Sequence, residues 1–251
     1  MDKREYAKMY SLERTYWWFQ GRKRIVMTLL APLLRDDRDQ TLVDLGCGTG
    51  LILDDLGERG RAVGVDFSEL ALGFCRDRGI RSLAQADVTS LPLRTASADI
   101  VTLLDITEHV PDDRGLIREV ARILKPGGHA LLTVPAHQCL WSDHDRTLWH
   151  QRRYSKRSLL RLFEDSPLEV RRCTWAITFT FPPIVVFRLI QRMLPRRREP
   201  KTHLIPLPGW VNGFLKWLLH VEAWLLRRIN LPFGVSLVLI ARRKPDAGSP
   251  H

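Results

Sequence analysis

Hydrophobic residues follow two rhythms along this chain. Short apolar runs, such as 41–45 and 61–66, alternate with longer stretches in which apolar residues recur every three or four positions. The first rhythm is typical of buried strands and the second of amphipathic helices. Strands that alternate with helices predict an α/β fold with a doubly wound, mostly parallel, Rossmann-like sheet.

The boundaries of these elements follow from the runs and from capping residues. Ser68 precedes Glu69 and a helical pattern, which predicts that Ser68 caps that helix. The predicted strands are 41–45, 61–66, 81–86, 98–104, 129–134, 168–175 and 235–242, the last of them antiparallel. The predicted helices are 5–34, 51–56, 69–78, 113–124 and 155–163.

We expect residues 1–245 to form a single domain. Its predicted parts are an N-terminal helical cap (1–40), a core (41–135), a substrate-side loop, helix and strand (136–176), a helical insertion (177–231) and the last strand (232–245). Residues 246–251 are predicted to be a disordered tail.

The strongest local signal is the loop Asp44-Leu-Gly-Cys-Gly-Thr-Gly50. A strand that ends in glycines and opens a helix lets a ligand approach the backbone and the helix N-terminus. The glycines stand at 46, 48 and 50, which disfavours the G-x-G-x-x-G spacing of dinucleotide loops. Asp66 ends the next strand, where a carboxylate accepts hydrogen bonds from ribose hydroxyls; alternatively, it is a helix N-terminal acid.

The composition bears on the kind of partner and on the cellular location. The 251 residues include 39 Lys and Arg against 28 Asp and Glu, a formal net charge of +11 that favours an anionic partner. The four cysteines form no C-x-x-C pair, which fits a reducing cytosol. The longest apolar run, 177–190, is interrupted by Pro182, Pro183 and Arg188, so no spanning helix is predicted. We expect a cytoplasmic protein, with peripheral contact at the inner membrane face left open.

Four motifs occur together in a specific order: 44–50, Gly64-Val-Asp66-Phe-Ser68, Ala86-Asp87-Val88 and Leu124-Lys-Pro-Gly-Gly128. In this order they resemble class I S-adenosylmethionine (SAM)-dependent methyltransferases, most of all the small-molecule enzymes of ubiquinone and biotin biosynthesis. The resemblance covers residues 41–135 and implies SAM as the cofactor.

The resemblance also implies roles for individual residues. Gly46, Gly48 and the adjoining backbone would pack against the methionine part of SAM, and Asp66 would hold the ribose. Asp87 and Val88 would bind the adenine, and Asp105 would lie beside the cofactor at the reaction centre. A turn acid is the alternative for both Asp87 and Asp105. The full set of expected cofactor-binding residues is Asp44, Gly46, Cys47, Gly48, Asp66, Phe67, Asp87, Val88 and Asp105.

Two clusters are candidates for the acceptor side, because each follows a strand at the edge where open α/β sheets bind ligands. Thr107-Glu108-His109 offers a base or, equally, a helix cap. The polar loop after residue 135 suits an anionic or polar head group, although solvated arginines are the plainer interpretation. The candidate catalytic residues are His109, His144, His150 and Tyr154; the candidate substrate-binding residues are Trp18, His137, Trp141, Arg152 and Arg153.

A metal site at His144, Asp145 and His150 is disfavoured, because nothing fixes that spacing on one helix face. We therefore predict no metal ligands. The N-terminal aromatic residues 16–19 are expected either to cover the cofactor or to anchor the first helix in the core. Arg22, beside them, is a charge-based candidate for the SAM carboxylate.

The insertion carries an apolar stripe at helical spacing. Its members are Trp210, Phe214, Trp217, Leu218, Val221, Trp224 and Leu225. Arg196, Arg197, Arg198 and Lys201 precede it. Such a pattern is typical of a helix in a membrane interface, but it also fits a lid over a lipophilic substrate or the seam of a homodimer.

The sequence thus predicts a methyltransferase for a small, lipophilic, lipid-like or isoprenoid acceptor with a polar or anionic head. An RNA methyltransferase is the first alternative, disfavoured because the chain lacks an Asn-Pro-Pro-Tyr element and room for an RNA-binding module. A SAM-binding protein without activity is the second.

Overall fold

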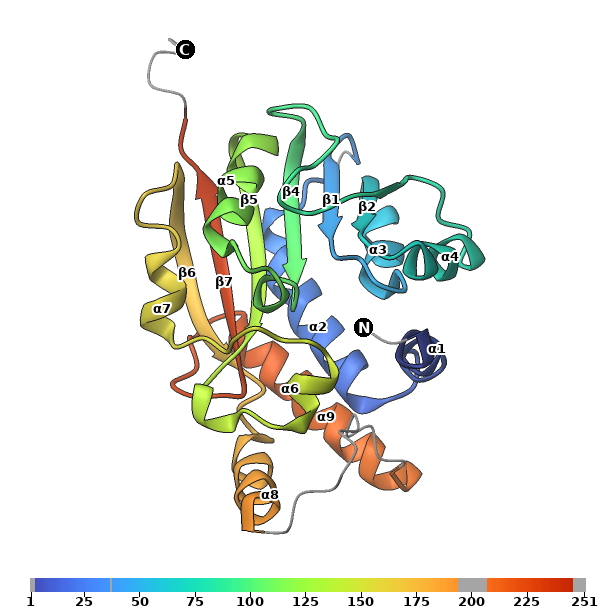
Figure 1. Ribbon diagram of the computed structural model, residues 1–251, viewed down its shortest axis with the longest axis vertical. Helices are drawn as coiled ribbons and strands as arrows, with labels where there is room; N and C mark the ends of the chain where they lie inside the picture. The colour runs from blue at the N-terminus through green and yellow to red at the C-terminus, as the bar shows by residue number, and fades with distance from the viewer. Residues whose placement is uncertain (1–2, 37, 194–206, 246–251) are drawn as a thin grey trace.

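A seven-stranded sheet forms the centre of the computed structural model, which describes residues 3–36, 38–193 and 207–245. The predicted tail and the cations at 196–198 and 201 lie outside these residues. The strand order is β3-β2-β1-β4-β5-β7-β6 (Figure 1). The strands are β1 (Thr41–Leu45), β2 (Arg61–Asp66), β3 (Leu83–Gln85), β4 (Ala98–Leu104), β5 (Leu124–Pro135), β6 (Leu168–Ala176) and β7 (Ser236–Arg243).

The sheet is parallel except at β7, which pairs antiparallel with both β5 and β6. This confirms the predicted Rossmann-like class and the direction of the last strand. The longer helices are α1 (Lys3–Leu12), α2 (Trp17–Leu30), α3 (Leu51–Gly57), α4 (Glu69–Asp77), α5 (Asp113–Ile123), α8 (Phe181–Met193) and α9 (Gly209–Leu226). Two short helices, α6 (Asp143–Thr147) and α7 (Lys156–Arg161), complete the substrate side.

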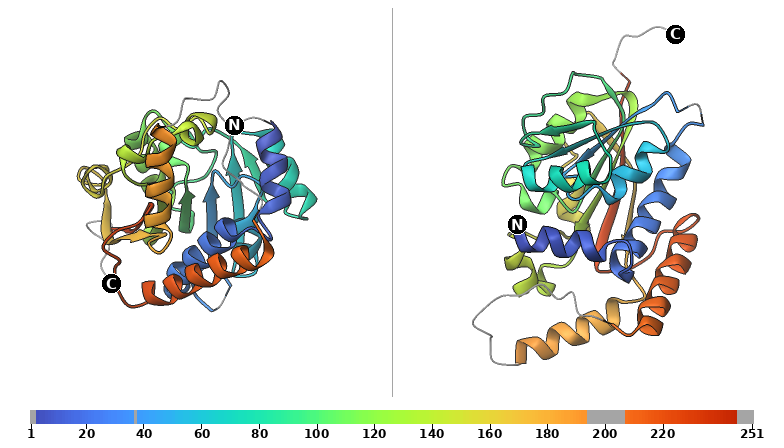
Figure 2. Two further views of the ribbon diagram at one scale, coloured as in Figure 1. Left: turned by 90° about the horizontal axis from the view of Figure 1, so that it is seen from below. Right: turned by 90° about the vertical axis from the view of Figure 1, so that its right-hand side faces the viewer.

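Alternating residues of each strand build two cores. On β7, for instance, Leu237 and Leu239 face α5 and α7, whereas Val238 and Ile240 face α2, α3 and α9. This alternation is the period of two that a sheet covered on both faces requires. Figure 2 shows α9 lying along α2, while α8 extends away from the body of the molecule.

The contact between α2 and α9 is unusually close. Gly21 on α2 has no side chain, and a Cβ atom there would lie 2.1 Å from Cδ1 of Leu219. Leu219 therefore occupies the space that any other residue at position 21 would need. The two helices are held against one face of the sheet as a unit.

Two boundaries differ clearly from the sequence predictions, and one predicted cap is confirmed. The single helix predicted over 5–34 is two helices, separated by residues 13–16, and Glu13 in this break forms a buried ion pair with Arg78. The turn predicted at 125–128 belongs to β5, which begins at Leu124; Gly127 permits this with a positive φ of 80°. The predicted cap was correct: Ser68 Oγ accepts a hydrogen bond from the Ala71 N–H.

Among the described residues, no helix has both the length and the apolar character needed to cross a membrane.

Candidate active site

A cavity of about 1170 Å³ opens at the carboxyl ends of β1, β2, β4 and β5. Helices α1 and α2 form its other side, as their position beside these strand ends shows (Figure 1). All nine residues that we expected to bind a cofactor line this cavity. The edge is the one where open α/β sheets bind ligands.

The glycine loop after β1 is shaped by positive backbone angles. Gly46, Gly48 and Gly50 have φ values of 69°, 55° and 84°, which residues with a side chain rarely adopt. A Cβ at Gly46 would also lie 2.8 Å from the side chain of Ile106. The glycines thus allow the loop to turn sharply and leave its backbone facing the cavity.

Asp66 holds this loop and still faces the cavity. Its Oδ2 accepts a hydrogen bond of 2.9 Å from Gly48 N–H, and its Oδ1 accepts one of 2.9 Å from Ser68 N–H. Burial raises the pKa of the carboxyl group despite these bonds. Each carboxylate oxygen can accept a second hydrogen bond, so the residue fits the two hydroxyls of a ribose. The Ser68 bond lies at the start of α4, as expected for a helix N-terminal acid, while binding of a ribose by Asp66 stays a prediction.

The neighbouring acids suit the rest of a nucleoside cofactor. Asp87 is exposed at the cavity edge, and hydrogen bonds from Thr89 N–H and Oγ1–H to Oδ1 lower its pKa. Its Oδ2 makes no hydrogen bond among the described residues. Val88 is buried beside it, and Phe67 is 76% exposed at the rim. An exposed ring and a free carboxylate oxygen are groups that an adenine can engage.

Asp44 and Asp105 lie deeper. Burial raises the pKa of Asp44 to about 7, although Thr102 Oγ1 donates a 2.6 Å hydrogen bond to it. Asp105 has a φ of 56° and pairs with Arg22 at 2.9 Å. Arg22 is therefore engaged by Asp105, while its guanidinium still lines the cavity.

The N-terminal cap is fastened to the glycine loop by a residue that the sequence did not single out. Glu13, buried between α1 and α2, accepts a 2.6 Å hydrogen bond from Thr49 Oγ1 and pairs with Arg78. Arg78 also donates to Thr49 O at 2.7 Å. No local pattern marks Glu13, because its partners lie 36 and 65 positions further along the chain.

The cap aromatics are placed so that both of the roles we considered stay open. Tyr16, Trp17, Trp18 and Phe19 all line the cavity. Trp17 and Trp18 also pack against the core formed by α2, α9 and the sheet.

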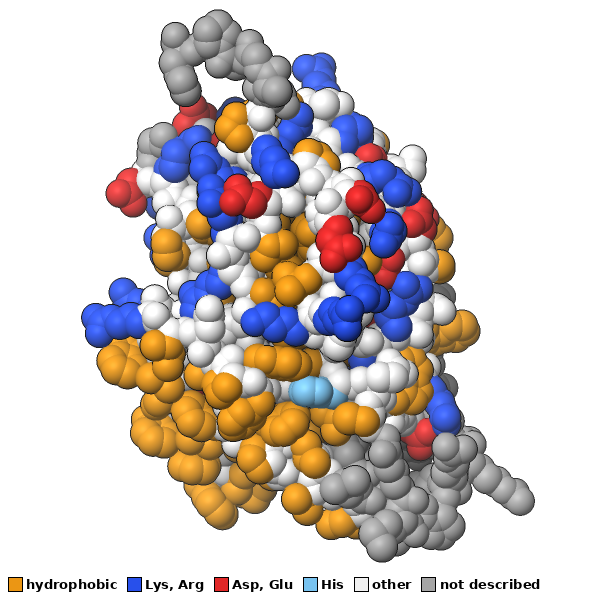
Figure 3. Space-filling view, turned by 90° about the vertical axis from the view of Figure 1, so that its left-hand side faces the viewer, with side chains coloured by type: hydrophobic (Ala, Val, Ile, Leu, Met, Phe, Trp, Pro, Cys, Tyr) orange, Lys and Arg blue, Asp and Glu red, His pale blue; other side chains and the backbone are white. Residues whose placement is uncertain are grey.

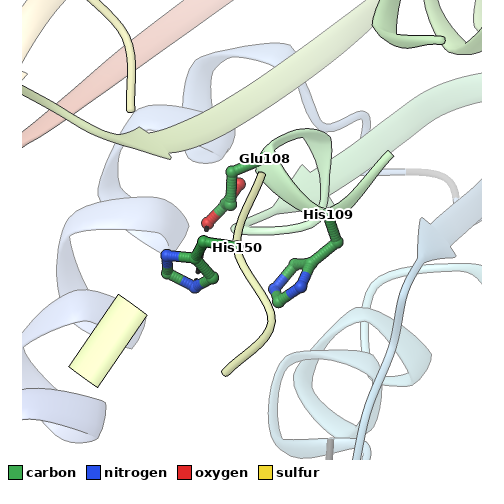
Figure 4. Close-up of side chains that lie close together, drawn as sticks. All are labelled: Glu108, His109 and His150. Atoms are coloured by element: carbon green, nitrogen blue, oxygen red, sulfur yellow. Dashed lines mark ion pairs between the residues drawn. The ribbon is translucent and has the colours of Figure 1, made fainter. Parts of the chain in front are cut away.

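On the acceptor side, three polar side chains meet at the cavity wall. Glu108 and His109 come from the short helix after β4, and His150 comes from the loop after α6 (Figure 4). The His109 and His150 rings are nearly perpendicular, with centroids 4.7 Å apart. His150 Nε2 lies 4.0 Å from Glu108 Oε1.

Glu108 is buried and the two histidines are half-buried, and the cluster is only partly hydrogen-bonded. Both carboxylate oxygens of Glu108 lack a hydrogen-bond partner among the described residues, and burial followed by the charge of Asp105 raises its pKa. Burial, with His150 nearby, lowers the pKa of His109 to about 4, so its imidazole is neutral near pH 7. An unpaired buried carboxyl is costly unless a ligand or proton satisfies it.

Asp145 lies behind His150 and fixes its orientation. Its Oδ1 is 3.0 Å from His150 Nδ1 and also accepts a 2.7 Å bond from Arg153 Nε. Burial opposes the charge, but the bonds from His150 and Arg153 keep the Asp145 pKa well below its usual range. Because the carboxylate only accepts, His150 Nδ1 carries the hydrogen and Nε2 is left as an acceptor.

The same three residues fit a divalent cation. Their potential ligand atoms lie within 4.8 Å of one another. Two imidazoles and a carboxylate are ligands of zinc and related ions, and a carboxylate behind a ligating histidine is the usual outer support. From the sequence we had considered a different trio, His144, Asp145 and His150, and predicted no metal ligands.

The structure separates the remaining candidates. His109, His150, Trp18 and Arg153 line the cavity, whereas the side chain of His144 lies outside the described ones. Four residues do not line it: Tyr154, Arg152, His137 and Trp141. Tyr154 is buried, and its hydroxyl donates a 2.9 Å hydrogen bond to Asp113. Arg152 pairs with the same Asp113, and His137 stacks on Trp175.

The sheet order, the glycine loop and the acids after β2 and β3 define a Rossmann-like protein that binds a nucleoside cofactor. Comparisons with known proteins identify the family within this class. Residues 43–132 match the family model described as a methyltransferase domain. A ubiquinone biosynthesis O-methyltransferase of Idiomarina loihiensis is 30% identical over 196 residues, which cover 67% of this chain and 81% of that protein.

A second enzyme of that name, from Marinobacter nauticus, is also 30% identical, but the match covers only 53% of this chain and 63% of that protein. Solved structures are similar in fold. One is a complex of the Haloferax volcanii Trm112 methyltransferase activator with a methyltransferase (TM-score 0.62, 22% identity, 98% and 96% of the two chains). Another is the geranyl diphosphate C-methyltransferase of Streptomyces coelicolor with Mg²⁺, geranyl diphosphate and S-adenosylhomocysteine (0.57, 19%, 86% and 76%).

The chain belongs to the SAM-dependent methyltransferase family, and SAM is its cofactor.

Proposed function

We propose that this methyltransferase acts on a hydroxyl group of a small lipophilic molecule with a polar head. One observation carries the proposal. The cluster of Glu108, His109 and His150 lines the cavity beyond the end of β4, and both carboxylate oxygens of Glu108 lack a hydrogen-bond partner among the described residues.

Much of the rest of the acceptor side is apolar. Aromatic and aliphatic side chains line it: Trp17, Trp18, Leu104, Ile106, Leu148 and Ile184. A pocket with a mainly apolar wall and a few converging polar groups suits a molecule with a greasy body and one reactive polar end. Names of two compared proteins, a ubiquinone biosynthesis O-methyltransferase and a geranyl diphosphate C-methyltransferase, are in keeping with such an acceptor.

In the proposed reaction His150 acts as the general base. SAM supplies the methyl group. As the acceptor oxygen bonds to the methyl carbon and the methyl–sulfur bond breaks, the hydroxyl proton passes to His150 Nε2. Asp145 stabilises the imidazolium through Nδ1–H. The cavity walls contribute by holding the oxygen on the axis of displacement, which is worth up to about 7–11 kcal/mol in favourable cases.

The test compares His150→Gln with His129→Gln in the full chain. Methyl transfer from labelled SAM is measured on a panel of catechols and hydroquinones with alkyl tails. We expect His150→Gln to lower kcat by roughly 10²- to 10⁴-fold with unchanged affinity for S-adenosylhomocysteine. His129 lies in the middle of β5 and does not line the cavity, so its variant should retain activity. Equal activity of both variants would exclude His150 as the base.

A cation-assisted reaction is the second candidate, favoured by the unpartnered carboxylate of Glu108. The cation would polarise the hydroxyl at Glu108, His109 and His150 instead of leaving His150 as the base. Loss of activity in EDTA, restored by Mg²⁺ or Zn²⁺, would establish this version. Full activity in EDTA would support the metal-free base.

The two alternatives from other classes have their own signatures. Tight binding of S-adenosylhomocysteine without turnover of any acceptor would indicate a non-catalytic SAM-binding protein. A salt-sensitive mobility shift with RNA, together with RNA methylation, would indicate a nucleic-acid methyltransferase. Either result would overturn the lipophilic acceptor while leaving the cofactor site intact.

A further inference from the structure

The aromatic stripe of α9 faces outward, away from the protein core. The helix packs on α2 and the sheet through another face, formed by Leu219, Glu222, Ala223 and Leu226. The opposite stripe contains Trp210, Phe214, Trp217 and Trp224, which are between 53% and 78% exposed. Four large aromatic groups on the solvent side of one helix need a partner, since burying them in water-free surroundings is favourable.

The neighbouring elements enlarge this apolar surface. Nine of the twelve exposed large hydrophobic residues in the described structure lie between Phe179 and Phe233. Val186 and Ile190, one turn apart on α8, are 55% and 51% exposed. Figure 3 shows hydrophobic side chains covering the lower part of one side of the molecule. We call the surface formed by the outward sides of α8 and α9 the apolar base.

The charges around the apolar base are positive. Figure 3 shows a band of Lys and Arg side chains directly above it. Arg227 and Arg228 are exposed at the end of α9, and Lys216 lies within it. These three cations make no ion pair among the described residues. An unneutralised basic rim is complementary to an anionic surface, whereas it would repel an identical copy of itself.

Tryptophan is the side chain that most favours the boundary between lipid and water, and arginine binds anionic headgroups there. We propose that the apolar base docks this methyltransferase on the surface of an anionic lipid bilayer, with the aromatic side chains of α9 inserted among the headgroups.

The position of α8 gives this docking a consequence for the reaction. Ile184 on α8 lines the cavity, while Val186 and Ile190 on the same helix belong to the apolar base. One helix thus separates the bilayer surface from the acceptor pocket. A lipophilic acceptor would reach the pocket from the membrane past α8, a step that rests on the proposed function.

The experiment is co-sedimentation of the full chain with vesicles. The vesicles contain either equal parts of phosphatidylcholine and phosphatidylglycerol or phosphatidylcholine alone. We expect binding to the anionic vesicles to be at least about tenfold tighter and to weaken with salt, because each rim cation contributes to the attraction.

Matched variants separate the apolar from the charged contribution. Phe214→Ser with Trp217→Ser should weaken binding at least about tenfold, whereas Leu70→Ser, an exposed leucine on α4, should not. Arg227→Glu with Arg228→Glu should weaken binding about tenfold or more. The control is Arg81→Glu with Arg94→Glu, which should not weaken binding. Both cations are exposed; Arg81 lies just before β3, and Arg94 lies between β3 and β4.

Two results would overturn the docking. One is wild-type protein that stays in the supernatant with both kinds of vesicle. The other is a dimer in light scattering that Phe214→Ser with Trp217→Ser dissociates, without vesicle binding. The docking and the proposed function fail separately, because S-adenosylhomocysteine binding and methylation of water-soluble catechols are measured without vesicles.

Discussion

The two halves of the cavity are built in different ways. The cofactor half consists of a glycine loop and acids at strand ends, and its groups are hydrogen-bonded to one another, as Asp66 is to Gly48 and Ser68. The acceptor half brings Glu108 and His150 together from segments about forty positions apart, and among the described residues it leaves Glu108 without a hydrogen-bond partner. The cofactor half is preorganised for SAM, the ligand that the whole family shares. The acceptor half retains polar groups that await hydrogen bonds from its own ligand.

The largest expected effect concerns the fastening of the cofactor half. Arg78→Met leaves Glu13 buried without its cation, and we expect a loss of about 3–5 kcal/mol in the free energy of unfolding. Arg76→Met is the control, because its pair with Glu69 is exposed and worth less than about 1 kcal/mol. Urea denaturation followed by circular dichroism gives both values; equal losses would mean that the Glu13–Arg78 pair does not hold the cap.

The partial burial of His109 in the acceptor half should make the free energy of unfolding depend on pH. Because the pKa of His109 is about 4 in the folded chain and near 6.5 when unfolded, the unfolded chain binds more protons between these pH values. This contribution to stability is therefore lost as the pH falls from 6.5 towards 4, by up to about 3 kcal/mol. Asp44 acts in the opposite direction, so wild-type stability alone is not diagnostic.

The diagnostic quantity is the difference in unfolding free energy between wild type and His109→Gln. We expect this difference to grow in favour of the wild type as the pH rises from 4 to 6.5. A difference that is the same at both pH values would contradict a buried, neutral His109.

A smaller effect is expected on cofactor affinity. Asp66→Ala removes the acceptor for the ribose hydroxyls and should raise the Kd for S-adenosylhomocysteine about 10- to 150-fold, as for one charge-assisted hydrogen bond or two weaker ones. Asp77→Ala, an exposed acid on the same side of the sheet, should leave the Kd unchanged. Isothermal titration calorimetry measures both, and unchanged affinity in Asp66→Ala would break the assignment of the cofactor half.

The contrast between the halves also explains how far the sequence could be interpreted. The strands and the sheet class followed from local patterns, and the nine residues that the family resemblance proposed for the cofactor all line one cavity, because a loop and the strand that leads into it are contiguous in the chain. The trio of Glu108, His109 and His150 did not follow as a unit, since the path of the loop after β5 decides what meets His150. Tyr154 could not be interpreted from the sequence for the same reason. Only the fold reveals that its hydroxyl donates a hydrogen bond to Asp113.

The orientation of the α9 stripe was open for a similar reason. Helical spacing identified the members of the stripe, but both sides of α9 are apolar, with Leu219 and Ala223 on one and Trp217 and Trp224 on the other. Which side faces the core depends on α2, some two hundred positions earlier in the chain.

The smallest effect is expected at Tyr154. Tyr154→Phe removes one buried hydrogen bond to Asp113, which should cost about 1 kcal/mol of unfolding free energy. Methyl transfer should stay within about twofold of wild type, because the hydroxyl does not face the cavity. A hundredfold loss of kcat in this variant would place Tyr154 in catalysis, as the sequence first suggested, and would require a different shape for the acceptor half.

The fit of Gly21 against Leu219 has a consequence for how this protein can diverge. The α2 helix carries cavity-lining aromatics at its start, and it touches α9 at a residue without a side chain. Any larger residue at position 21 would push the two helices apart and shift the pocket wall, unless position 219 shrank at the same time. These two sites form a compensatory pair, and among homologous sequences that keep α9 their volumes should vary in opposite directions.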